Sequence, residues 1–211
     1  MKKILYFILI NLFLCFPTWC AESPQLAMGQ VQQAIDSHDP ELFEKYVDVR
    51  SIIDHGVDTL IAEFSSRPSG KKDNVLLDLL SGGLGQHSQS PAGQQIKQLL
   101  AEETRKFVIR GVASGSFSGQ EAKAQVLPDG GIFALIFADA STARKEFRSI
   151  NLVSANDGHA LVAGQVYDFG SERSYPVLLN LTLQPQGHWQ VQQVHNMPEL
   201  VRMIRQEAEN L

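Results

Sequence analysis

The stretch YPVLLNLTLQ, residues 175–184, alternates apolar and polar side chains over nearly its whole length. A period of two is typical of a strand that buries one face and leaves the other in water. Only Leu178 interrupts the polar side. The stretch therefore predicts a half-buried strand of an antiparallel sheet, with these side chains on its core face: Tyr175, Val177, Leu179, Leu181 and Leu183.

Turn-forming residues divide the surrounding chain into segments of strand length. They occur at 156–158, 170–172 and 185–187, where Asn, Asp, Gly, Ser and Pro are concentrated. Three turns between extended segments predict four antiparallel strands within residues 144–196. In the last strand, Trp189 and Val191 are expected on the core side.

The first half of the chain carries helix start signals instead. Ser23-Pro24, Asp39-Pro40 and Ser90-Pro91 each join a capping side chain to a proline, which needs no hydrogen-bond donor at the first helical position. Asp48 is expected to cap a further helix that continues past Gly56. Its apolar stripe is Ile53, Val57, Leu60 or Ile61, and Phe64.

The helix that starts at Pro91 is predicted to end at Gly111. The small residues of 111–119 then indicate a linker. After the sheet, Asn196 and Pro198 predict a closing helix. The inward face of the helix from Pro91 is expected to be Ile96, Leu99, Leu100, Phe107 and Val108.

Helices followed by a meander of strands predict an α+β fold. We expect N-terminal helices packed on a curved four-stranded antiparallel sheet, with an inserted helical segment within 65–140 and a C-terminal helix. The run Ile132–Phe137 fits a strand or a short helix. The expected organisation is a leader at 1–20 and a single domain at 21–211, which is mainly helical over 21–111, forms the sheet over 144–196 and ends in a helix over 197–211.

Residues 1–20 have the composition of a secretory signal peptide. Lys2 and Lys3 precede an apolar run that extends to Phe16, and Cys20 offers a small residue at the cleavage site. Cleavage there would remove both cysteines of the chain. A lipid anchor on Cys20 is the alternative, although the bulky Trp19 before it disfavours lipidation. We therefore expect a protein exported to the periplasm or the outside of a bacterium.

The charge balance limits the classes of partner. The chain has 18 basic and 23 acidic side chains, a net charge of −5. Loss of the leader would remove two lysines and no acid, giving about −7. An acidic surface disfavours nucleic acid and anionic lipid as partners. Contact with a membrane is expected only through the export signal.

Two segments carry a resemblance to a known group. The segment AIDSHDPELFEKYVDV, residues 34–49, resembles small exported bacterial proteins of unknown function that have a nuclear-transport-factor-2-like, or cystatin-like, fold. The segment WQVQQVHN, residues 189–196, is similar to the last strand of the same group. The resemblance implies a curved sheet wrapped around helices, with a cavity between them.

The sequence offers three candidate catalytic residues, Asp54, His55 and His195. An Asp and a His in a pocket of this fold would carry out general acid and base catalysis. The ordinary interpretation is a solvated helix face for the first two and a core or rim position for His195. No cofactor is expected, and no metal, because ligand spacings typical of zinc or calcium sites are absent from the sequence.

These observations leave three functional classes. The first is a non-enzymatic module that binds a small apolar ligand or a partner protein in the cell envelope. The second is a small pocket enzyme, a hydrolase or isomerase, that uses Asp/His chemistry. The third is an envelope-associated module that docks on another protein through its helical middle.

Overall fold

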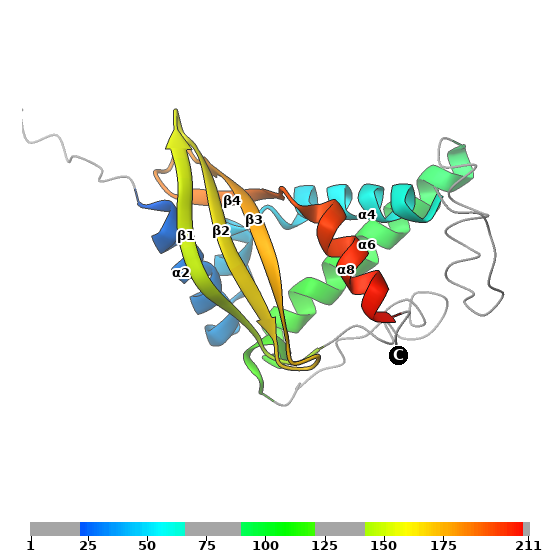
Figure 1. Cartoon of the computed structure of the whole chain (residues 1–211), viewed down its shortest axis with the longest axis horizontal. Coiled ribbons are helices and arrows are strands. Elements are labelled where there is room, and N and C mark those ends of the chain that lie inside the picture. The colour runs from blue at the N-terminus through cyan, green and yellow to red at the C-terminus, as the bar shows by residue number, and fades with distance from the viewer. Residues whose placement is uncertain (1–21, 66–89, 121–141, 209–211) are drawn as a thin grey trace, which may run out of the picture.

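The computed structural model of the chain describes residues 22–65, 90–120 and 142–208. They form an α+β fold in which N-terminal helices pack on a four-stranded antiparallel sheet that is followed by a C-terminal helix (Figure 1). The predicted fold class is confirmed. The leader, the segment around 66–89 and the run Ile132–Phe137 lie outside the described residues, so the expected insertion is seen only in the two elements between 91 and 118.

The first two helices begin where the sequence predicts them. Helix α2 spans Pro24–Ser37, and the Ser23 hydroxyl accepts from the Leu26 amide at 3.2 Å. Helix α3 spans Pro40–Tyr46, and Asp39 Oδ1 accepts from the backbone amide three residues later at 2.9 Å. Each cap satisfies an amide that has no partner inside the helix.

Helix α4, Val49–Ser65, starts beside the last strand of the sheet. Asp48 caps it by accepting from the Ser51 amide at 3.0 Å, and the Asp48 amide donates to the Val191 carbonyl at 2.8 Å. Helix α4 continues past Gly56 as predicted, with Ile53, Val57 and Ile61 buried. The start of α4 is thereby fixed against the last strand.

Helix α6, Pro91–Ala113, departs from the prediction at two points. It ends two residues beyond Gly111, and Leu99 is 53% exposed rather than turned inward. Leu100 and Phe107 are buried as predicted. Leu99 is exposed because α6 packs closely along one side only, so a residue one position away from the buried stripe faces outward.

The predicted linker 111–119 is also wrong. Its first residues complete α6, and Ser116–Ser118 form a short 3₁₀ helix, η2. Phe117 is buried there and packs edge-on against Phe107, with ring centroids 5.9 Å apart. The small residues of this segment let one aromatic ring come close to the helix, so the segment belongs to the core.

The sheet has the predicted four strands. They are β1 (Lys145–Asn156), β2 (His159–Asp168), β3 (Arg173–Leu183) and β4 (Trp189–Val194), in the order β1-β2-β3-β4, and every neighbouring pair is antiparallel. The core face of β3 is the predicted one, with Val177, Leu179 and Leu181 buried.

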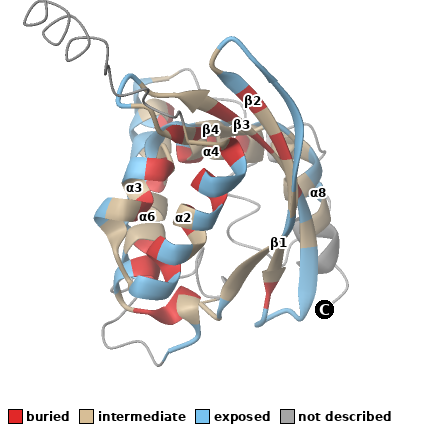
Figure 2. Ribbon diagram, turned by 90° about the vertical axis from the view of Figure 1, so that its left-hand side faces the viewer, coloured by how far each residue is buried: buried red, intermediate tan, exposed pale blue. Residues whose placement is uncertain are grey.

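The core lies between the sheet and the helices. Figure 2 shows the buried residues gathered where the helices face the sheet. Met28 and Val31 of α2, and Val162 and Leu181 of the sheet, are each less than 2% exposed. Burying side chains of this size contributes roughly 1.5–3 kcal/mol each, so this interface is a main source of stability.

Helix α8, Met197–Ala208, follows β4 and packs beside α4 (Figure 1). The predicted closing helix is thus present. None of the helices in the described part of the chain combines the length and apolar character that crossing a membrane requires.

Candidate functional site

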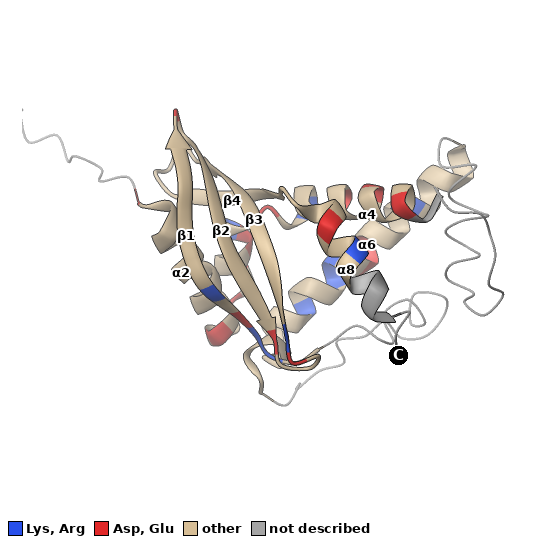
Figure 3. Cartoon of the chain, viewed as in Figure 1, with Lys and Arg blue, Asp and Glu red and all other residues tan. Residues whose placement is uncertain are grey.

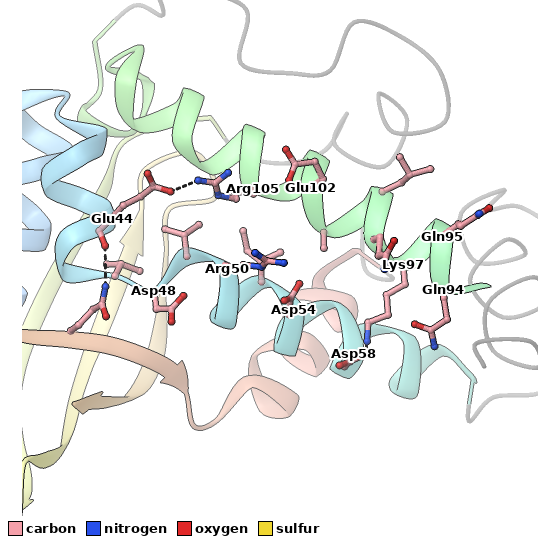
Figure 4. A pocket seen from close by; sticks show the side chains of 17 residues that line it. Glu44, Asp48, Arg50, Asp54, Asp58, Gln94, Gln95, Lys97, Glu102 and Arg105 are labelled. Carbon is pink, nitrogen blue, oxygen red and sulfur yellow. Dashed lines mark hydrogen bonds and ion pairs between the residues drawn. The ribbon is translucent and has the colours of Figure 1, made fainter. Parts of the chain in front are cut away.

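A groove of about 1320 Å³ runs between α4 and α6 (Figure 4). The start of α4, α3 and β4 close one end of it. Charged or amide side chains make up twelve of its 17 lining residues. The lining comprises Glu44, Val47, Asp48, Val49, Arg50, Ile53, Asp54, Asp58, Gln94, Gln95, Lys97, Gln98, Leu99, Ala101, Glu102, Arg105 and Gln190.

Two ion pairs bridge the groove. Lys97 Nζ lies 2.5 Å from Asp58, which joins α6 to α4, and Arg105 lies 2.6 Å from Glu44, which joins α6 to α3. The hydrogen bond to Glu44 raises the pKa of Arg105 above its ordinary value, and the charges of both Glu44 and Glu102 add to the effect. Both pairs are partly exposed, so each adds little stability, roughly 0–1 kcal/mol.

Other charges in the groove have no ion-pair partner within the described residues. These are Arg50 and Asp54 on α4 and Glu102 on α6. Asp48 accepts two hydrogen bonds from Ser51, at 3.0 Å and 2.8 Å. The lining has five carboxylates and three cations, so the groove is acidic.

The structure separates the neighbouring candidates Asp54 and His55. Asp54 is exposed and lines the groove, whereas His55 lies against β4, where its Nε2 is 3.3 Å from the Gln193 side-chain nitrogen. Consecutive residues point about 100° apart around a helix, so they meet different neighbours.

His55 and His195 belong to one chain of hydrogen bonds on the β4 side of α4. The Gln193 amide reaches His55, Asn180 Nδ2 donates to Gln193 Oε1 at 3.2 Å, and the same Asn180 nitrogen lies 3.5 Å from His195 Nδ1. Side-chain amides thus separate the two imidazoles. In this arrangement both rings offer a nitrogen to an amide donor, which fixes orientation without activating a base.

No hydrogen bond or ion pair within the described residues places a carboxylate on either of these histidines. The same part of the chain holds no cluster of three or more His, Cys, Asp or Glu suited to a metal ion. The observed chemistry around these histidines is therefore polar contact.

Sequence reasoning missed most of the groove, although a signal was present. Arg50, Asp54 and Asp58 recur every four residues and so share one face of α4. On α6, Gln98, Ala101 or Glu102, and Arg105 also follow helical spacing. Such polar stripes on two helices indicate a solvated face, and only the packing of α4 beside α6 turns them into two walls of one groove.

Comparisons of the chain with protein-family models, with curated proteins and with solved structures find no significant match.

Proposed function

We propose that the chain is a non-enzymatic binding module of the bacterial cell envelope, which holds a segment of a partner protein between α4 and α6. The observation that carries this proposal is the groove of about 1320 Å³ with its unpaired charges. The signal-like leader at 1–20 supports the location. The order of helices and strands supports the likeness to the nuclear-transport-factor-2-like fold.

The size and lining of the groove favour a polypeptide segment over a compact small molecule. Pockets for small molecules usually have volumes of about 300–1,000 Å³ and mainly apolar walls. This groove is larger, and most of its lining is charged or amide. A lining that mixes charged, amide and apolar side chains is typical of the interfaces of non-obligate protein complexes.

The charge of the groove favours a segment that carries Lys or Arg. Asp54 and Glu102 have no ion-pair partner within the described residues, and they outnumber the single unpaired cation, Arg50. A basic side chain that enters between α4 and α6 would meet carboxylates from both walls. Complementary charge of this kind raises the association rate and selects the partner.

The packing of the sheet on α2 is the reason for choosing a partner protein over an apolar ligand between sheet and helices. Met28, Val31 and Leu181 belong to one hydrophobic core cluster and are almost completely buried. Side chains packed to this degree fill the space that an apolar ligand would need.

The alternative, a pocket enzyme that uses Asp54, His55 or His195, has less support. Acid and base catalysis by an Asp/His pair requires the two groups within hydrogen-bond reach of one reacting atom. Asp54 faces the groove, while the two histidines bond to amides on the other side of α4. The groove therefore supports binding better than it supports catalysis.

Fluorescence anisotropy with three labelled decapeptides tests the proposal: one rich in lysine, one rich in glutamate and one apolar. We expect the lysine-rich peptide to bind best and to weaken as salt rises. Neutralising Asp54→Asn together with Glu102→Gln should weaken its binding about fivefold for each charge removed, equivalent to about 1 kcal/mol per close pair in water.

Glu103→Gln is the matched control. Glu103 is the neighbour of Glu102 on α6, but it pairs with Lys106 at 2.8 Å and does not line the groove. The control should bind the lysine-rich peptide as the unmodified protein does. Equal binding of all three peptides, or equal loss in the control, would contradict the proposal, and preference for the apolar peptide would point to an apolar ligand instead.

A further inference from the structure

The second half of strand β1, residues 151–156, forms an exposed edge of the sheet. β1 is the terminal strand, and all six of these residues are exposed (Figure 2). Leu152 is 38% exposed and Val153 is 56% exposed. An edge strand presents backbone donors and acceptors that can pair with another chain.

The first half of the same edge is covered within the molecule. The side-chain amide of Gln32 on α2 forms two hydrogen bonds with the backbone of β1. Its Oε1 accepts from the Phe147 amide at 2.9 Å, and its Nε2 donates to the Lys145 carbonyl at 3.4 Å. Helix α2 thus supplies hydrogen-bond partners to the backbone of the first half of β1. Residues 151–156 lie beyond this contact.

The pairing of β1 with β2 shows which backbone groups face outward. In an antiparallel ladder, residues alternate between those bonded to the neighbouring strand and those directed away from it. Phe147 is directed away, because its amide bonds Gln32, and its partner on β2 is Val166. Val162 and Ala160 lie four and six residues before Val166 on β2, so they have the same orientation in the ladder. Their partners on β1 are Leu152 and Ala155, whose amides and carbonyls therefore also face outward.

We propose that a second copy of this chain pairs with this edge, antiparallel, with Leu152 of each copy opposite Ala155 of the other. A two-fold axis between Val153 and Ser154 places Leu152 of one copy opposite Ala155 of the other, and Ala155 opposite Leu152. The same backbone hydrogen bonds then form on both sides of the axis, as an isologous interface requires.

Charge and composition favour a second copy as the occupant. The segment 151–156 reads NLVSAN, with no charge and no proline, so antiparallel self-pairing opposes no like charges. Figure 3 shows this part of β1 without charged residues up to the turn that follows it. Lysine and proline, the usual guards of an exposed edge, are absent from these six residues.

Two irregularities limit the length of the contact. The register with β2 shifts between Arg148 and Asn151 and again between Leu152 and Ser154. Bulges increase the local twist and interrupt regular pairing. The expected interface is therefore short, and the dimer forms by a weak equilibrium that depends on protein concentration.

Sedimentation velocity over a concentration series from about 10 μM to about 1 mM, a span suited to weak association, tests the proposal. The mean mass should rise from one copy towards two. Val153→Lys and Val153→Glu should each abolish the rise, because residue 153 lies next to its own counterpart across the axis. An equimolar mixture of the two variants should restore association, since opposite charges then meet.

Ala92→Lys is the control, because it introduces the same charge at an exposed apolar residue of α6 that does not line the groove. It should leave the mass distribution unchanged. Ala155→Pro supplies a second test: it removes an outward-facing amide that β2 does not use, and it should abolish association without unfolding the protein. A monomer throughout the series, or association that the residue 153 variants leave intact, would overturn the proposal.

Discussion

Asp168 is a buried carboxylate at the end of β2. It accepts from Lys145 Nζ at 2.8 Å, from the Gly170 amide at 2.9 Å and from the Ser171 hydroxyl at 3.3 Å. Lys145 also donates to the Ala143 carbonyl at 2.9 Å. Burial lowers the pKa of Lys145, and the bond to Asp168 offsets part of this effect. The pair links the first strand to the turn between the second and third.

Removing one partner of this pair should destabilise the fold. Asp168→Leu leaves the Lys145 ammonium partly buried without its carboxylate, which should cost about 3 kcal/mol in the free energy of unfolding. Urea denaturation at neutral pH measures this loss. The double variant Asp168→Leu, Lys145→Met should be more stable than Asp168→Leu alone, and a less stable double variant would contradict the coupling.

The pH dependence of stability follows from the same pair. The folded-state pKa of Lys145 lies below its ordinary value. Between the two values the unfolded chain binds more protons, so the contribution of Lys145 to the free energy of unfolding rises with pH through this window. The difference in unfolding free energy between the unmodified protein and Lys145→Met should therefore rise as pH approaches 10.5. A falling difference would mean that Asp168 raises the pKa of Lys145 by more than burial lowers it.

Gly111 is a single residue whose lack of a side chain is required by packing. A β-carbon there would lie 2.3 Å from the Phe117 ring. Gly111→Ala should therefore destabilise the protein by about 1–3 kcal/mol through overpacking, despite the better helix propensity of alanine. Thermal unfolding measures this change.

Gly29→Ala on α2 is the matched control for Gly111→Ala. A β-carbon at Gly29 meets no atom within 4 Å, so alanine should stabilise the helix by about 0.5–1 kcal/mol. The two substitutions should thus have opposite signs. Stabilisation by both would show that Phe117 moves aside at no cost.

At the scale of elements, the contact between α2 and β1 depends on Gln32. Gln32→Ala removes the side-chain amide that bonds the edge of β1 and should cost about 1 kcal/mol. Gln33→Ala, on the exposed side of the same helix, should change stability little, because no side-chain hydrogen bond of Gln33 joins the helix to the described strands. Equal effects on the urea midpoint would contradict the role of Gln32.

Local signals in the sequence predicted the elements well. The Ser-Pro and Asp-Pro pairs mark real helix starts because the capping side chain and the proline act within a few residues. The alternation along β3 identifies its buried face for the same reason. Each of these signals depends on neighbours in the chain, which the sequence displays directly.

Contacts between distant segments escaped prediction. Phe117 lies in a segment of small residues, and its ring occupies the space left by the missing side chain of Gly111 on α6. Leu99 has an apolar side chain, but nothing in the local pattern shows that α6 turns it outward. The prediction of a shared catalytic site met the same difficulty. Asp54 and His55 are neighbours in sequence, yet their surroundings depend on which elements pack beside α4.

At the scale of the molecule, the helices that form the groove extend to one side of the body made by α2 and the sheet (Figure 1). The central strands have neighbours on both sides and contain Val162 and Leu179, which are buried. The first half of α6, in contrast, contains the exposed residues Gln95, Gln98 and Leu99. The two parts therefore differ in how much contact holds them in place.

Amide hydrogen exchange should reveal this difference. The amides of Val162 and Leu179 should exchange about 100-fold or more slowly than those of residues 95–99, because sparsely packed segments open without global unfolding. Exchange followed by NMR in deuterated water measures both sets. Equal protection would mean that the groove wall opens only when the whole fold does. If the first half of α6 opens separately, a bound lysine-rich segment should slow exchange there more than in the sheet, since it would bridge two walls that move independently.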